Sequence, residues 1–195
     1  VPAARFPRTL VCSKCERIGM VGKQFDGTGM GTPRCNANGC SGHGVPARIV
    51  TACFHSAKDG EADLQPGHID EFPWEAWAFS AHDGQKCKSP QLFLGALGNT
   101  SSLAGLRVEC RCPECEERTP KYIGRTLADV FQPDNLGGLR CFGRRPWLND
   151  EQSGCGRKIR ALLRGASNVY FHVSASALSI PPYSEALVQL ISERC

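Results

Sequence analysis

The stretch Val108-Glu-Cys110-Arg-Cys112-Pro-Glu-Cys115 decides how the rest of this chain can fold, because it places three thiols within six positions. A Cys-x-x-Cys turn holds two sulfurs on one side of a tight loop, where both can bind the same tetrahedral ion. Two isolated cysteines follow at Cys141 and Cys155, and they are the expected remaining ligands. We therefore predict a zinc site made of Cys112, Cys115, Cys141 and Cys155, in which Cys110 can replace Cys112.

A second group of cysteines lies near the start of the chain. Cys12-Ser-Lys-Cys15 is followed by Cys35-Asn-Ala-Asn-Gly-Cys40, whose Gly and Asn residues tolerate left-handed backbone angles. This spacing is typical of a zinc ribbon. The sequence therefore predicts a four-cysteine zinc site at Cys12, Cys15, Cys35 and Cys40.

The segment between these two lobes offers a third, mixed site. Its candidate ligands are Cys53, His68, His82 and Cys87. Imidazole and thiolate are both good zinc ligands, but the alternative is that the histidines form hydrogen bonds in the core and the cysteines pack as small hydrophobes. We therefore expect two Zn²⁺ ions per chain, with a third left open.

The cysteine pattern also indicates a compartment. Twelve cysteines in 195 residues are clustered, as metal ligands are, and not spread as in a disulfide framework. No apolar run approaches the length of a membrane span, and no signal peptide opens the sequence. We expect a cytoplasmic protein without a membrane partner, with disulfides in a secreted protein as the alternative. The chain starts at Val1 and ends within a helical pattern, so we expect a piece of a longer protein.

The hydrophobic pattern predicts an α+β fold of small zinc-ribbon-like lobes, with short antiparallel strands and few short helices. Asp70 is the expected N-cap of a short helix that buries Phe72, Trp74 and Trp77. Strands are expected at 45–53, 92–94, 103–108 and 169–173, a helix or strand at 157–163, and a helix at 185–194. The expected units are a zinc lobe at 1–51, an aromatic-rich segment at 52–107, a second zinc lobe at 108–165, and a strand with a truncated helix at 166–195.

Basic residues are concentrated around the second lobe. The net charge is only +4, but the range 140–164 contains seven basic residues and only two acidic ones, Asp150 and Glu151. A basic surface of this kind suits a polyanion, although a solvated face without a partner is the alternative. The predicted nucleic-acid-binding residues are Arg140, Arg144, Arg145, Arg157, Lys158, Arg160 and Arg164.

Several segments together resemble the DrmB family, the accessory subunits of bacterial DISARM anti-phage systems. The segments are Arg5-Phe-Pro-Arg, Val45-Pro-Ala-Arg-Ile-Val-Thr-Ala-Cys53, Gly67-His-Ile-Asp-Glu-Phe-Pro-Trp74, Cys141-Phe-Gly-Arg-Arg-Pro-Trp147, Arg164-Gly-Ala-Ser-Asn-Val-Tyr-Phe171 and Ser176-Ala-Leu-Ser-Ile-Pro181. They cover nearly the whole chain in the family's order, although the family's proteins are several times longer. The resemblance implies a non-catalytic partner of a DISARM-type helicase, acting on phage DNA in the bacterial cytoplasm.

Two enzymatic hypotheses compete with this non-catalytic function. His68 with Asp70 and Glu71 could form the centre of a metal-dependent hydrolase or nuclease, since a carboxylate beside a His-bound metal can activate water. Cys112 and Cys115 could instead be a redox pair, but a thioredoxin-type motif belongs at the start of a helix in a strand–helix–strand unit. Neither reading has a second cluster of catalytic side chains to support it, so we expect that the chain is not an enzyme.

Overall fold

The computed structural model describes residues 5–27, 31–53, 67–81, 86–98, 102–117, 123–132, 134–136, 138–146, 154–166, 169 and 192–193. Four small antiparallel sheets make up the described part of the chain. Two short α-helices and one 3₁₀ turn accompany them. The expected α+β class, with short strands and zinc-ribbon-like cysteine lobes, is therefore confirmed.

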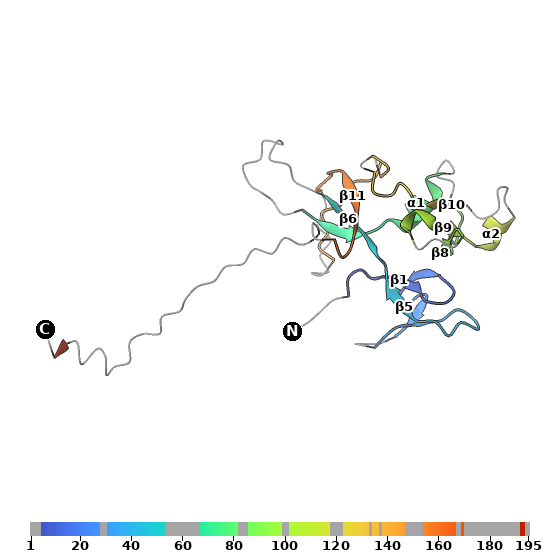
Figure 1. The fold of residues 1–195 in the computed structure, drawn as a ribbon, viewed down its shortest axis with the longest axis horizontal. Coiled ribbons are helices and arrows are strands. Elements are labelled where there is room, and N and C mark those ends of the chain that lie inside the picture. The colour runs from blue at the N-terminus through green and yellow to red at the C-terminus, as the bar shows by residue number, and fades with distance from the viewer. Residues whose placement is uncertain are drawn as a thin grey trace.

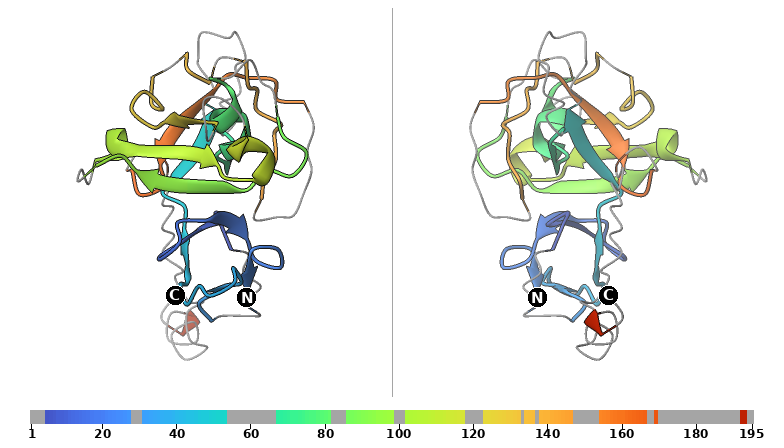
Figure 2. Two further views of the ribbon diagram at one scale, coloured as in Figure 1. Left: turned by 90° about the vertical axis from the view of Figure 1, so that its right-hand side faces the viewer. Right: turned by 90° about the vertical axis from the view of Figure 1, so that its left-hand side faces the viewer.

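The N-terminal lobe is built on the strands β1 (Thr9–Cys12), β2 (Ile18–Met20) and β5 (Gly44–Pro46), in the order β2-β1-β5. A second pair, β3 (Phe25–Asp26) with β4 (Arg34–Cys35), completes it. The lobe has its own small core, in which Leu10 and Phe25 are fully buried beside the cysteines. In Figure 2 it is the blue unit below the other sheets.

The second sheet has the order β10-β9-β8, with β8 (Leu92–Ala96), β9 (Leu106–Cys110) and β10 (Gly124–Thr126). The 3₁₀ turn Leu103–Gly105 leads into β9, and α2 (Pro113–Glu116) follows it. The N-terminal lobe contacts the edge strand β8, since the Leu94 N–H donates to the Glu16 carbonyl at 2.9 Å.

The third sheet has the order β11-β6-β7, with β6 (Ile49–Cys53), β7 (Ile69–Glu71) and β11 (Ile159–Leu163). All five residues of β6 are buried, as expected for a central strand. Because β11 is more than a hundred residues away in sequence, this pairing ties the end of the described chain back to its first half (Figure 1).

Helix α1 (Trp74–Phe79) covers β9 and β10. Phe72, Trp74 and Trp77 are buried as expected, and the two tryptophan rings meet Phe72 edge-on. The prediction that Asp70 caps this helix was wrong, because Asp70 lies in β7 and Pro73 occupies the N-cap position. The three residues Ile69, Asp70 and Glu71 are extended because β7 pairs with the buried β6.

The expected strand at 45–53 is divided into β5 and β6, and the residues at 157–163 form the strand β11. The expected strand at 169–173 and helix at 185–194 lie almost wholly outside the described residues. The expected boundary between the units 52–107 and 108–165 falls within β9, which pairs with β8 of the preceding unit.

Candidate metal centres

Three clusters of potential metal ligands are present in the described part of the chain, each with four ligand atoms within 4.8 Å of one another. We call them the N-terminal, central and mixed clusters. The N-terminal cluster contains Cys12, Cys15, Cys35 and Cys40; the central cluster contains Cys87, Cys110, Cys112 and Cys115; the mixed cluster contains Cys53, His68, Cys141 and Cys155.

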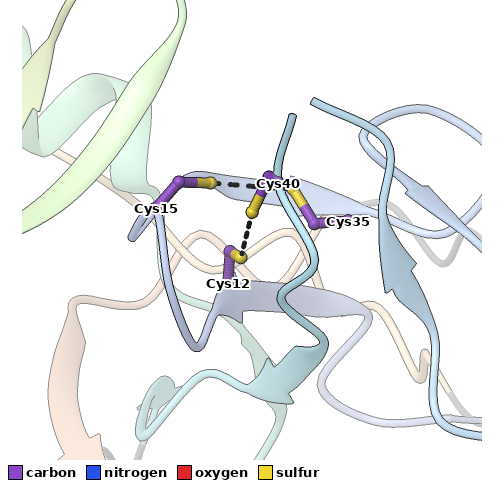
Figure 3. A group of neighbouring side chains, drawn as sticks. All are labelled: Cys12, Cys15, Cys35 and Cys40. Carbon is purple, nitrogen blue, oxygen red and sulfur yellow. Dashed lines mark hydrogen bonds between the residues drawn. The ribbon is translucent and has the colours of Figure 1, made fainter. Parts of the chain in front are cut away.

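The N-terminal cluster is assembled by two chain segments that approach each other from opposite sides. Cys12 ends β1 and Cys15 follows in the turn, while Cys35 belongs to β4 and Cys40 to the loop behind it. The sulfurs converge in Figure 3, with Cys12 to Cys40 and Cys15 to Cys35 both at 3.6 Å. The four thiols predicted from the sequence as one site are therefore brought together.

Backbone amides point at the sulfurs of this cluster. The Lys14 N–H donates to Cys12 Sγ and the Gly42 N–H donates to Cys40 Sγ, both at 3.4 Å. Such donors stabilise the thiolate form and orient metal ligands. Glycine at position 42 allows this approach, because a Cβ there would lie 2.4 Å from Cys12 Sγ.

The central cluster lies where β9 runs into α2. Cys110 ends β9, Cys112 and Cys115 flank the first turn of α2, and Cys87 comes from the segment before β8. All four thiols are buried, and Cys87 Sγ is 3.5 Å from Cys110 Sγ. The Gln91 N–H donates to Cys110 Sγ at 3.3 Å, so this cluster also has an amide donor.

The mixed cluster lies at one end of the β11-β6-β7 sheet. Cys53 ends β6, and its sulfur is 3.5 Å from His68 Nδ1 and 3.8 Å from Cys155 Sγ. The His68 N–H donates to Cys53 Sγ at 3.2 Å, and the Gly143 N–H donates to Cys141 Sγ at 3.3 Å. Three thiols and one imidazole are a common zinc ligand set.

The thiols within a cluster differ in proton affinity. Burial raises the pKa of Cys15, Cys115 and Cys141 to about 12 each. Burial also acts on Cys12, but hydrogen bonds from the backbone N–H groups of the following turn, with those to neighbouring thiols, lower the pKa of Cys12 to about 7. The N-terminal cluster therefore holds both an easily formed thiolate, Cys12, and a thiol that keeps its proton at neutral pH, Cys15.

The distances within the clusters fit a tetrahedral ion better than a disulfide. Zinc–sulfur bonds of about 2.3 Å place two tetrahedral sulfurs roughly 3.8 Å apart. Four sulfur pairs in the clusters are separated by 3.5–3.8 Å, and all the ligand atoms of a cluster lie within 4.8 Å of one another. A disulfide needs about 2.0 Å, and the described cysteines are free thiols. Thiolate and imidazole ligands at this spacing can hold Zn²⁺, which would cross-link the segments that supply them.

The predicted site of Cys112, Cys115, Cys141 and Cys155 was wrong in one respect. Cys112 and Cys115 do lie together, and so do Cys141 and Cys155, but the two pairs belong to different clusters. Strand pairing is the reason. The antiparallel pairing of β8 with β9 brings Cys87 back to the central cluster, and Cys53 lies opposite Ile159 of β11, beside Cys141 and Cys155.

The predicted mixed site was also wrong in its composition. Cys53 and His68 do share one cluster, whereas Cys87 belongs to the central one, and His82 lies outside the described residues. Cys110 does not replace Cys112, because both are in the central cluster.

The residues of the two enzymatic readings have other partners. His68 lies among three thiols, while Asp70 Oδ2 is 3.6 Å from Arg144 Nε. Cys112 and Cys115 are two of four clustered thiols, and α2 after Cys112 spans only Pro113–Glu116. Although α2 lies between β9 and β10, these two strands pair antiparallel. The strands of the strand–helix–strand unit of a thioredoxin-type redox centre are parallel.

Five of the seven predicted basic residues lie within four positions of Cys141 or Cys155, whereas Arg160 and Arg164 lie in and after β11, which leads away from the mixed cluster. Arg140 forms an antiparallel bridge with Lys158, and Arg160 follows two residues later on the same face of β11. These three side chains are exposed, as is Arg144. The remaining three, Arg145, Arg157 and Arg164, are partly buried.

One exposed aromatic residue in this region was missed. Phe142 is 59% exposed, and the Arg144 guanidinium lies 4.8 Å from the centre of its ring. Its position directly after Cys141 was a signal that the sequence offered. Trp147, which follows in the same segment, is outside the described residues.

Comparison with known proteins gives two matches. The family model described as "Domain of unknown function (DUF8724)" matches residues 1–171. The DISARM protein DrmB of Bacillus paralicheniformis (strain ATCC 9945a / NCIMB 11709 / CD-2) is 36% identical over 185 residues, covering 93% of this chain and 29% of the relative. The resemblance to the DrmB family is thereby confirmed, and the chain spans less than a third of the relative's length. Among the described residues, no helix has the length and apolar character needed to cross a membrane.

Proposed function

Because this chain belongs to the family described as "Domain of unknown function (DUF8724)" and is similar to a DISARM protein DrmB, we propose that it is a zinc-stabilised, non-catalytic module of bacterial anti-phage defence. Its ligands are DNA and a DISARM-type helicase subunit, and it works in the cytoplasm, where thiols stay reduced. Each of its three clusters binds one Zn²⁺.

The observation that carries the DNA-binding part is the row of Arg140, Lys158 and Arg160, which we call the basic row. The bridge between Arg140 and Lys158 fixes two of these side chains next to each other, and the alternation of β11 turns Arg160 to the same side. Lys158 forms an ion pair with Asp134, whose Oδ1 is 3.8 Å from Nζ, and both side chains are mostly exposed. Water screens such a pair, so the row keeps its attraction for phosphates.

The metal clusters give this row a fixed position. The Cys141 N–H donates to the Arg157 carbonyl at 2.8 Å, and the Gly156 N–H donates to the Cys141 carbonyl at 2.9 Å. The segments that carry Arg140 and Lys158 are therefore held together at the mixed cluster. Guanidinium groups suit phosphate because their planar donors can bond two oxygens at once.

The closed ligand sets favour a structural role for zinc. Catalytic zinc sites keep a position open for water, with three protein ligands, whereas structural sites have four. Each cluster here supplies four. The helicase partner is inferred from the resemblance to DrmB alone.

The salt dependence of DNA binding tests this proposal. Fluorescence anisotropy with a labelled oligonucleotide should show binding that weakens steeply with salt, because neutralised phosphates release counterions. Arg140→Ala combined with Arg160→Ala should reduce the slope of log K against log salt by about 0.7–0.9 per lost contact.

Lys23→Ala combined with Lys88→Ala is the matched control, because it removes two exposed charges outside the basic row. The control variant should keep the parent slope. If both double variants changed the slope equally, the basic row would not be the DNA-binding face, and a chain without any DNA affinity would contradict the proposal.

A further inference from the structure

A cavity of about 250 Å³ lies between the β6–β7 edge and the segment that carries the mixed cluster. Its walls combine apolar and polar side chains, and two cations are among them. The residues that matter for its chemistry are Thr51, Asp70, Leu139, Arg140, Phe142 and Arg144. This volume is below the roughly 300–1,000 Å³ of pockets for drug-sized ligands, so it suits one planar ring.

Phe142 forms one wall of this cavity and is 59% exposed. Its backbone is fixed on both sides, since Cys141 belongs to the mixed cluster and the Gly143 N–H donates to Cys141 Sγ. Gly143 adopts a positive φ of 72°, which favours glycine and turns the chain there. A large apolar ring is thus held in solvent by a rigid segment, which is the arrangement of a stacking platform.

The polar groups of the cavity are arranged by charge. Arg140 is exposed and adjoins Lys158 of the basic row, while Arg144 lies against the Phe142 ring and is 3.6 Å from Asp70 Oδ2. The Asp70 carboxylate is partly buried and also accepts a hydrogen bond from the Glu71 N–H at 2.8 Å. The cavity therefore offers cations for a phosphate, an aromatic face for a ring, and an acceptor for a ring N–H or amino group.

From this geometry we infer that the cavity receives one unpaired base of single-stranded DNA. Phe142 stacks on the base, and Arg140 and Arg144 contact the adjoining phosphates. The base must be unpaired, because bases inside a duplex are stacked on their neighbours and present only their edges. This inference rests on the proposed function, since it specifies which form of DNA the basic row binds.

Anisotropy measurements on the zinc-loaded 195-residue chain test it, with a labelled oligothymidylate and a duplex of the same length as probes. Phe142→Ala should weaken single-strand binding by about 5- to 150-fold, the range expected for one lost base stack. The Phe142→Ala variant should bind the duplex as tightly as the parent does, with the same slope of log K against log salt. Phe142→Trp should retain single-strand affinity.

Phe131→Ala is the matched control, because Phe131 is 42% exposed and does not line the cavity. A second measurement on the parent chain does not depend on the folding of any variant: the parent should bind an abasic strand of equal charge more weakly than oligothymidylate. Where Phe142→Ala is folded, it should cause no further loss of affinity for the abasic strand.

The outcomes separate this inference from the proposed function. If the parent binds DNA in a salt-dependent way but Phe142→Ala and the abasic strand have no effect, the base-binding cavity is wrong and the DNA-binding module stands. If the parent binds neither single strands nor duplex, both are wrong.

Discussion

Gly42 shows how closely the backbone approaches the N-terminal cluster. A Cβ at this position would lie 2.4 Å from Cys12 Sγ and 3.1 Å from the Lys14 Cβ, so Gly42→Ala must displace a ligand. Overpacking of this kind costs about 1–3 kcal/mol even without a metal. We expect Gly42→Ala to lower the zinc content by one ion per chain and to lower the melting temperature.

Gly31→Ala is the control for this variant, because a Cβ there meets nothing within 4 Å and its φ is not positive. It should keep the parent's zinc content, measured by inductively coupled plasma mass spectrometry. If Gly42→Ala keeps it as well, then the N-terminal cluster does not hold the ion in the geometry described.

At the level of residues, the sequence was informative about ligands and uninformative about their partners. A Cys-x-x-Cys turn makes Cys12 with Cys15, and Cys112 with Cys115, neighbours by local geometry alone. The partners of Cys53 and Cys87 depend on strand pairings between distant segments. Phe142 was missed because hydrophobic patterns do not reveal that one aromatic ring is exposed.

At the level of elements, helix α1 packs against β9 and β10 of the second sheet. Trp77 is almost fully buried, its Nε1 donates to the Thr126 carbonyl at 3.2 Å, and the Arg125 guanidinium lies 3.8 Å from its ring centre. Trp77→Ala removes this packing and leaves the partly buried Thr126 carbonyl without this donor. We expect a loss of about 3–5 kcal/mol in the free energy of unfolding.

Chemical denaturation of the zinc-loaded chain measures this loss. Phe131→Ala, at a residue that is 42% exposed, should change the free energy of unfolding by less than about 0.5 kcal/mol. Equal effects of the two variants would mean that α1 contributes no more to stability than an exposed turn.

Strands and helices were predictable from the sequence where the hydrophobic pattern was strong. The five residues of β6 form a buried β-branched and apolar run, and the strand was expected there. The short helix was expected but its start was not, because Asp70 is a good N-cap in isolation and yet pairs with Thr51 of β6. Tertiary pairing outweighed a local capping preference of about 1 kcal/mol.

At the level of the whole molecule, the clusters compensate for sheets of only two or three strands. Small sheets bury little apolar surface, and structural zinc contributes apparent binding energies of about 10–16 kcal/mol in small peptides, comparable to the stability of a domain. The N-terminal, central and mixed clusters each join segments of the chain that the small sheets alone hold together with few strand pairings.

Stability should therefore depend on pH through the metal. Zinc binds thiolates, so it must displace the protons of thiols such as Cys15 and Cys141, whose pKa burial raises to about 12. Binding releases protons, which means that zinc affinity rises with pH and falls as protons compete at lower pH. We expect the melting temperature of the zinc-loaded chain to drop between pH 8 and pH 5.

Calorimetric titration of the zinc-free chain in two buffers of different ionisation enthalpy measures the protons released. A chelator-treated sample, whose clusters carry no ion, should lack the metal-linked part of the pH dependence. Zinc binding without proton release at pH 7 would contradict the thiol chemistry described for the clusters.

The number of zinc ions per chain tests the central claim most directly, because each cluster provides one complete set of four ligands. Native mass spectrometry of the purified chain should show three zinc ions. Cys15→Ser, Cys115→Ser and Cys155→Ser should each reduce the number to two, and the triple variant should bind none. A parent chain with two ions or fewer, or a single variant that loses two ions at once, would contradict three independent centres.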